Sequence, residues 1–246
     1  MKAMNILLSF ALLFASATAV SAGTVFWDDD FESYADQAGF DAAWPNFSGT
    51  QPTWSTDQST SPTHSILEPA GSPGRVVSAT TYADNINGSD AAPLVLEYDI
   101  YINPNDLTSS RRYVELRQTA GDLNLFAIGL SNLATNPTSD FAFRNHFTWT
   151  DLAAPRLAGW NHVKAVIDST DINITINNEP TESFARNNLD DYGTLYMGSG
   201  FSNNTVAPFD GFTYIDDLSV ERIPEPSTLV LLGLAGLGLV ARRRRK

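Results

Sequence analysis

Between positions 23 and 222, apolar residues recur mostly at every second position, and helical spacing is almost absent. In residues 94–102, for example, every even-numbered residue is apolar. Successive side chains of a β-strand point to opposite faces, so this period of two predicts half-buried strands. The same pattern predicts strands at residues 75–80, 113–118, 123–131, 141–149, 163–167, 172–176, 195–201 and 212–221.

Turn-forming residues separate these segments. Residues 119–122 and the pair Ser169-Thr170 are expected to form tight turns, and Pro180 ends a strand because proline cannot donate to a central ladder. Residues 45–73, which are rich in Ser, Thr and Pro, and residues 187–192 are predicted loops. About ten strands in one single-cored segment favour a two-sheet antiparallel sandwich, with a closed barrel as the alternative.

The N-terminal residues 1–22 are typical of a secretory signal peptide. Lys2 gives the positive start, residues 6–15 are apolar apart from Ser9, and Val20-Ser21-Ala22 is a small-residue cleavage site. The alternative is a membrane anchor, for which the apolar run is too short. We therefore expect cleavage after Ala22.

The C-terminal residues 227–241 are uncharged and mostly apolar, and five cations follow at 242–246. A helix of this length covers about 22 Å, short of the roughly 30 Å hydrocarbon core of a membrane. The cations would stay cytoplasmic by the positive-inside rule. The sequence predicts a marginal membrane segment with the rest of the protein outside. Five consecutive cations argue against the alternative, a buried strand with a basic tail.

The charge of the central segment limits its partners. The chain has 15 Lys and Arg residues against 28 Asp and Glu residues. Six cations lie in the two end segments, which hold no acids, so nine cations remain against 28 acids, a formal charge of −19. Such a surface repels nucleic acid and anionic lipid and suits neutral glycans or cations. The chain has no cysteine, so disulfides cannot stabilise the exported domain.

Pro224-Glu225-Pro226, an apolar helix and an arginine cluster, in this order at the C-terminus, resemble the PEP-CTERM sorting signal of Gram-negative bacteria. The resemblance covers residues 223–246. It implies cleavage near Pro-Glu-Pro by an exosortase, a membrane transpeptidase, after the precursor is transiently held in the inner membrane. It also implies a final location at the cell surface or in an exopolysaccharide matrix.

Residues 160–168 (WNHVKAVID) and 171–177 (DINITIN) resemble a hairpin of concanavalin A-like and laminin-G-like jelly rolls. Residues 27–32 and 214–220 are similar to the first and last strands of such domains. The resemblance implies an all-β jelly roll for residues 23–222. This fold hosts lectins, glycanases, polysaccharide lyases and adhesion modules, so it leaves the function open.

Acidic residues stand at both ends of the predicted domain, with Asp28, Asp29, Asp30 and Glu32 at the start and Asp216-Asp217 at the end. First and last strands of jelly rolls commonly pair, which would bring these carboxylates together. A calcium ion would relieve their repulsion. We predict a structural calcium site with Asp30 and Asp217 as its first ligands. The alternative is that the acids face water on edge strands.

The strand pattern also predicts a polar sheet face that could bind a glycan. Tyrosine rings stack on sugars, while carboxylates, arginine and histidine bond to sugar hydroxyls. The alternative is a solvated face with cross-strand ion pairs. The expected outward-facing residues are Glu97, Asp99, Tyr101, Tyr113, Glu115, Arg117, Arg144 and His146. Trp160 is expected in the core, and Trp54, in a polar loop, is a candidate sugar platform.

Catalytic patterns are incomplete. Glu97 and Asp99 resemble part of the E-x-D-x-x-E strand of concanavalin-like glucanases, but the third acid is missing. Residues 112–117 (RYVELR) resemble the R-x-E-L-R strand of alginate lyases with one extra residue, and the companion motifs of those enzymes are absent. The sequence therefore favours a non-catalytic carbohydrate-binding protein. The alternatives are a structural adhesion module that binds protein or itself, and a polysaccharide lyase or hydrolase.

Overall fold

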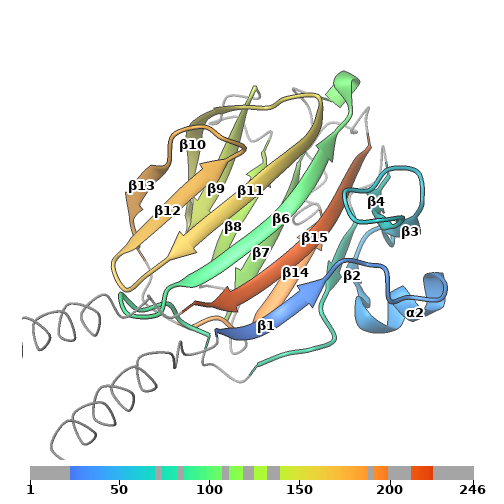
Figure 1. Cartoon of the computed structure of the whole chain (residues 1–246), viewed down its shortest axis with the longest axis horizontal. Coiled ribbons are helices and arrows are strands. Elements are labelled where there is room, and N and C mark those ends of the chain that lie inside the picture. Colours follow the sequence, from blue (N-terminus) through green and yellow to red (C-terminus); the bar gives the residue numbers. More distant parts are fainter. Residues whose placement is uncertain are drawn as a thin grey trace, which may run out of the picture.

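The computed structural model describes residues 23–69, 74–82, 86–106, 111–118, 125–131, 139–187, 191–198 and 212–223. These residues form two antiparallel sheets packed face to face (Figure 1). The predicted signal peptide with its cleavage site at Ala22, and the motif Pro224, Glu225 and Pro226, lie outside the described residues. The predicted bounds of the domain, 23 and 222, stay a prediction.

The sheet nearer the viewer in Figure 1, here called the front sheet, has the order β13-β12-β11-β6-β15-β4-β3, and β1 also pairs with β15. Its strands are β1 (Thr24–Asp29), β3 (Thr53–Ser55), β4 (Ser65–Glu68), β6 (Leu94–Ile102), β11 (Gly159–Ile167), β12 (Asp171–Ile176), β13 (Glu182–Ala185) and β15 (Thr213–Arg222). The long central strands β11, β6 and β15 position most of the residues discussed below.

The second sheet, here called the back sheet, has the order β10-β9-β8-β7-β14-β5-β2. Its strands are β2 (Asn46–Ser48), β5 (Arg75–Val77), β7 (Arg112–Arg117), β8 (Leu125–Leu130), β9 (Asp140–Asn145), β10 (Thr148–Pro155) and β14 (Thr194–Gly198). A 3-10 turn, η2 (Pro104–Asp106), lies on the path from β6 in the front sheet to β7 in the back sheet. The two-sheet antiparallel sandwich predicted from the sequence is confirmed.

Alternation along the strands builds the core between the sheets. On β6 the even-numbered residues, from Leu94 to Ile102, are fully buried, while Glu97, Asp99 and Tyr101 are half-exposed. On β11, Val163 and Ile167 point into the same core. Apolar burial of this extent is the main favourable term in folding. The sequence pattern and the packing therefore agree on the buried face of β6 and of residues 163–167 on β11.

One helix, α2 (Gln37–Ala43), was not expected from the sequence. The side chain of Asp36 caps it by accepting a hydrogen bond from the Gly39 amide at 2.9 Å. Only Phe40 of the helix is buried, where it contacts Phe31 and Tyr34. With two turns and one buried residue, the helix leaves no 3.6-residue pattern in the sequence. The predicted loop at 45–73 likewise contains the short strands β2, β3 and β4.

The first and last strands of the described chain pair with each other, as expected. Strand β1 runs antiparallel to β15 from the pair Thr24–Arg222 to the pair Asp29–Leu218. Beyond β1, β15 continues along β4 through Thr213–Ile215, and its other side pairs with β6. The acids that follow β1 therefore come close to those in the middle of β15.

Candidate functional site

The structure separates the predicted polar face into two groups. Glu97, Asp99 and Tyr101 lie on β6 of the front sheet. Tyr113, Glu115 and Arg117 on β7, together with Arg144 on β9, lie on the back sheet. The prediction that all these residues share one face is wrong, because the connection through η2 crosses from one sheet to the other instead of forming a hairpin.

His146 was expected on a strand, and this prediction is also wrong. It lies in the turn between β9 and β10, with a φ of 60° in the left-handed region. The register pairs Asn145 with Thr148, so His146 and Phe147 are the two residues of a tight hairpin. The predicted strand at residues 141–149 is thus two strands with a turn inside it.

Glu115 and Arg117 of the back-sheet group are buried and form ion pairs with buried neighbours. Both Arg75 and Arg117 bind the carboxylate of Glu115, Arg117 through Nε at 2.6 Å. All three side chains are at most 2% exposed. The guanidinium carbons of Arg75 and Arg117 lie 4.5 and 5.1 Å from the ring centre of Tyr196. A glycan cannot reach groups enclosed in this way, so Glu115 and Arg117 are structural residues here.

Tyr113 is enclosed as well. Its ring packs against Trp149 at a centroid distance of 5.4 Å, and the pair forms a small apolar cluster with Ala127 outside the main core. Burial raises the pKa of Tyr113. All six residues of β7 are buried, which means that both faces of this strand are covered.

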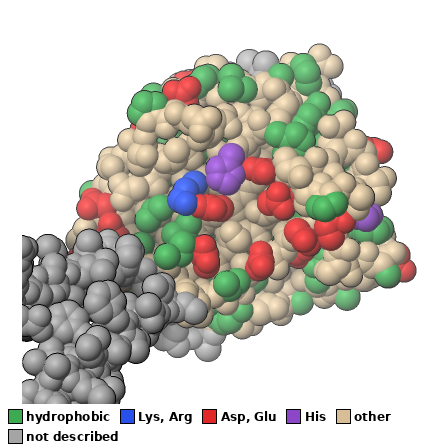
Figure 2. Space-filling view, in the orientation of Figure 1, with side chains coloured by type: hydrophobic (Ala, Val, Ile, Leu, Met, Phe, Trp, Pro, Cys, Tyr) green, Lys and Arg blue, Asp and Glu red, His purple; other side chains and the backbone are tan. Residues whose placement is uncertain are grey.

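The front-sheet group is accessible. We call the outward side of β11, β6 and β15 the front face; Figure 2 shows acidic side chains spread across it beside a histidine and a cation. Across β6 and β11, His162 is opposite Asp99 and Lys164 is opposite Glu97. His162 Nδ1 lies 2.8 Å from Asp99 Oδ1, and Lys164 forms an ion pair with Glu97. The hydrogen bond to Asp99 raises the pKa of His162.

The Lys164–Glu97 pair is exposed to solvent, with side-chain exposures of 41% and 28%. Exposed pairs of this kind are screened and gain little over hydrated charges. We therefore expect Lys164→Ala to change the free energy of unfolding by less than about 1 kcal/mol. A urea titration of the variant beside the wild-type protein measures this. A loss several times larger would mean that the pair holds the sheet together and is not available to a ligand.

A row of aromatic rings crosses the same face. The register places Tyr101 on β6 between Trp160 on β11 and Tyr214 on β15. Phe212 immediately precedes the first residue of β15. The centroid distances are 5.6 Å for Trp160–Tyr101, 5.8 Å for Tyr101–Tyr214 and 5.5 Å for Phe212–Tyr214. Tyr214 is buried, Trp160 and Tyr101 are half-buried, and Phe212 is exposed. Trp160 is thus not the core residue that the sequence suggested.

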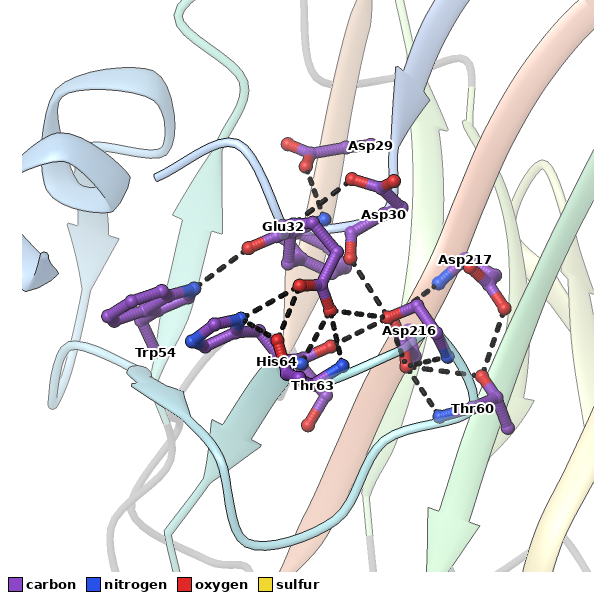
Figure 3. A network of polar contacts seen from close by, with 12 residues as sticks. Asp29, Asp30, Glu32, Trp54, Thr60, Thr63, His64, Asp216 and Asp217 are labelled. Atoms are coloured by element: carbon purple, nitrogen blue, oxygen red, sulfur yellow. Dashed lines mark hydrogen bonds and ion pairs between the residues drawn. The ribbon is translucent and has the colours of Figure 1, made fainter. Parts of the chain in front are cut away.

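A second polar cluster joins the two acidic ends of the described chain (Figure 3). Asp216 is fully buried, and its carboxylate accepts hydrogen bonds from the amides of Thr60 and Ser61 at 2.7 and 3.0 Å. The Ser61 hydroxyl bonds to Asp216 and also contacts Glu32 Oε1 at 3.1 Å. The loop carrying Thr60 and Ser61 therefore connects β15 to the segment after β1.

The two predicted calcium ligands belong to this region. Asp30 Oδ1 accepts a hydrogen bond from the Glu32 amide at 3.0 Å, and Asp217 Oδ2 receives the Thr60 hydroxyl at 3.0 Å. Burial and nearby acids raise the pKa of Asp217. Within the described ranges, no three His, Cys, Asp or Glu side chains converge as a metal site would require. Amide and hydroxyl donors occupy the Asp216 carboxylate instead, and the calcium site stays a prediction.

Trp54, the predicted sugar platform, stacks on His64 with ring centres 4.1 Å apart and planes 7° from parallel. Its indole nitrogen donates to the Phe31 carbonyl at 2.8 Å. His64 Nδ1 lies 2.9 Å from Glu32 Oε2, which fixes the imidazole (Figure 3). One face of the Trp54 ring is therefore already covered by protein.

The sequence was compared with models of protein families and with curated proteins. Residues 222–245 match the model of the PEP-CTERM protein-sorting motif. The protein is therefore exported and anchored by its C-terminus before processing, as expected from the sequence. No curated protein is significantly similar in sequence to the chain. Among the described residues, no helix is both long enough and apolar enough to cross a membrane.

Solved structures share the fold at low sequence identity. The cellulose induced protein Cip1 gives a TM-score of 0.52 at 13% identity, over 79% of this chain and 96% of Cip1. The binding domain of botulinum neurotoxin serotype D gives 0.51 at 12% identity, over 85% of this chain and 51% of that one. A sialidase gives 0.50 at 10% identity, and the chain spans only 18% of its length. The predicted jelly-roll sandwich is confirmed.

Proposed function

We propose that this exported protein binds polysaccharide without catalysing a reaction, at the cell surface or in the exopolysaccharide matrix of a Gram-negative bacterium. The front face is its binding surface. The observation that carries the proposal is the aromatic row on the front face, in which Trp160, Tyr101 and Phe212 are accessible and Tyr214 packs beneath them, next to charged side chains. The back-sheet residues Glu115 and Arg117 take no part, since they are enclosed.

The chemistry of the front face suits a sugar chain. Aromatic rings offer apolar surface to the C–H faces of sugar rings, and nearby polar groups bond to the hydroxyls. The pairs His162–Asp99 and Lys164–Glu97 lie on the same outward side of β6 and β11 as Trp160 and Tyr101. They provide both donors and acceptors at fixed positions in the register. A glycan lying across the strands would meet the rings first and these pairs beside them.

The charge of this surface favours a neutral polymer. Glu221 and Asp217 add further carboxylates on β15, and the central segment as a whole is strongly acidic. Uronic acid chains would be repelled by such a surface, especially at low salt. We therefore expect neutral polysaccharides to bind more tightly than polyuronates.

The arrangement of Glu97 and Asp99 supports binding over catalysis. A retaining glycosidase holds two carboxyl groups about 5–5.5 Å apart on either side of the scissile bond. Here the two carboxylates follow each other on one strand, Glu97 in an ion pair with Lys164 and Asp99 in a hydrogen bond with His162. On the β15 side, Glu97 is opposite Ser219 and Asp99 is opposite Asp216, whose buried carboxylate already accepts hydrogen bonds from the Thr60 and Ser61 amides.

Removing the half-buried indole from the row tests the proposal. We expect Trp160→Ala to weaken polysaccharide binding about tenfold, because loss of a stacked aromatic ring costs roughly 1–1.5 kcal/mol. Affinity electrophoresis of the full-length protein in mild detergent, over a range of polymer concentrations, gives the Kd. Phe147→Ala is the matched control, since Phe147 is an exposed ring (57%) on the β9–β10 hairpin of the back sheet. Equal affinity of both variants with the wild type would place the binding surface elsewhere.

A further inference from the structure

The sorting motif overlaps the folded domain. The match to the sorting motif begins at residue 222, and Arg222 is the last residue of β15. Near its end, β15 is paired on both sides, with β1 through Thr24–Arg222 and with β6 through Arg222–Leu94. Only Ile223 separates this strand from Pro224. The first residues of the sorting motif are therefore part of the sandwich.

Several further contacts fix this end of the strand. Arg222 Nε donates to the carbonyl oxygen of Asn87 at 3.0 Å, and its guanidinium carbon lies 5.3 Å from the ring centre of Phe26. The amide of Ile223 donates to the Pro93 carbonyl at 3.1 Å. A Cβ on Gly23 would stand 2.8 Å from the Arg222 carbonyl oxygen, so the backbone of residue 23 lies directly against the strand end. The chain is held in place up to the residue before Pro-Glu-Pro.

Enzymes that cut a peptide bond need the backbone on both sides of that bond free of other pairing. A strand with neighbours on both sides offers no free N–H or C=O groups for such binding. The rate of cleavage next to a folded element therefore depends on the fraction of molecules in which that element is locally unfolded. Pro-Glu-Pro directly follows Ile223. Cleavage there therefore requires local opening of the last residues of β15, and the rest of the strand can stay paired.

We propose that the paired end of β15 is a latch on processing: Arg222 and Ile223, held by β1, β6, Asn87 and Pro93, must unpair before the sorting enzyme can act at Pro-Glu-Pro. The partner is the membrane transpeptidase that the sorting motif implies, and its substrate is the open form of the latch. This inference does not depend on the proposed polysaccharide binding.

A flexible insertion tests the latch without disturbing the sandwich. An eight-residue Gly-Ser linker between Ile223 and Pro224 moves the motif away from the strand end and leaves every contact of Arg222 and Ile223 in place. In the producing bacterium, pulse labelling of the full-length chain follows the conversion of anchored precursor to processed protein. We expect conversion to be several-fold faster than for the wild-type chain. The same linker inserted between Ser169 and Thr170, in the β11–β12 turn, is the control and should leave the rate unchanged.

A second variant removes contacts that hold the latch closed. Arg222→Ala removes the contacts with Asn87 and Phe26 but keeps the motif adjacent to the strand, so it should give a smaller acceleration than the linker. The proposal would be overturned if the linker chain and the wild-type chain were processed at the same rate, or if neither were processed. A slower rate for the linker chain would also overturn it, because it would mean that the folded end presents the motif to the enzyme.

Discussion

Glu115→Ala is expected to destabilise the protein by about 3–5 kcal/mol, the usual cost of removing one partner from a buried ion pair. Glu115 binds both Arg75 and Arg117, and all three side chains are almost completely buried. Without the carboxylate, two guanidinium groups stay close together in a medium that solvates them poorly. Burial already lowers the pKa of Arg75. Chemical denaturation, read by tryptophan fluorescence, gives the free energy of unfolding.

The matched control is Glu97→Ala on the front sheet. Both residues are glutamates on central strands and both are paired with cations, but Glu97 is 28% exposed. Its loss should cost less than about 1 kcal/mol. Similar costs for the two variants, or a larger cost for Glu97→Ala, would contradict the division into an enclosed back-sheet cluster and an open front face.

The second large effect concerns the pH dependence of stability. Glu68 is fully buried between the sheets, and burial raises its pKa to about 7, although Arg112 Nε at 3.8 Å partly opposes this. Neither carboxylate oxygen has a hydrogen-bond partner among the residues that the structure describes. Gly198 makes room for the group, because a Cβ there would lie 2.7 Å from Glu68 Oε1. The neutral acid is thus the form that the fold favours.

The direction of the pH effect on stability follows from the pKa of Glu68 in the folded and unfolded states. Below the unfolded pKa of 4.5, Glu68 is protonated in both states and its contribution to stability is complete. As the pH rises towards 7, the unfolded chain loses the proton first, so stability falls, by on the order of 3 kcal/mol in total. Glu68→Gln keeps the shape without the titration. We expect the stability of this variant relative to wild type to increase by about this amount from roughly pH 4 to pH 8.

Unfolding curves of both proteins across this pH range measure the difference, and other titrating groups cancel in it. A difference that does not change with pH would show that Glu68 has the same pKa in the folded and unfolded states, so that burial does not raise it. A difference that falls with pH would mean that Arg112 outweighs burial.

The sequence predicts most of the long strands, because alternate residues of strands such as β6 and β11 are buried in the core. The alternation on β6 gives the correct buried side from Leu94 to Ile102, with the exception that Val95, on the outward side, is also buried. It does not say which sheet a strand joins. Strands β6 and β7 are neighbours in sequence but lie in opposite sheets, and this crossing separated Glu97 and Asp99 from Glu115 and Arg117. Nothing in the local pattern distinguishes such a crossing from a hairpin.

Two smaller errors have local causes. The alternation of residues 141–149 continues through the β9–β10 turn, so the pattern does not indicate that His146 adopts a left-handed conformation there. Trp160 was assigned to the core although it has the same parity on β11 as the outward residues His162 and Lys164. That parity was a usable signal for the aromatic row. The pairing of β1 with β15, in contrast, was expected from the resemblance to jelly rolls and is confirmed.

The most direct test of the central claim is the mobility of the full-length protein, in mild detergent, in gels that contain neutral or uronic acid polysaccharides. If the front face is a polysaccharide-binding surface, at least one neutral polymer will slow the protein and polyuronates will slow it less. The same mobility in every gel would contradict the account and would favour an adhesion module that binds protein or itself.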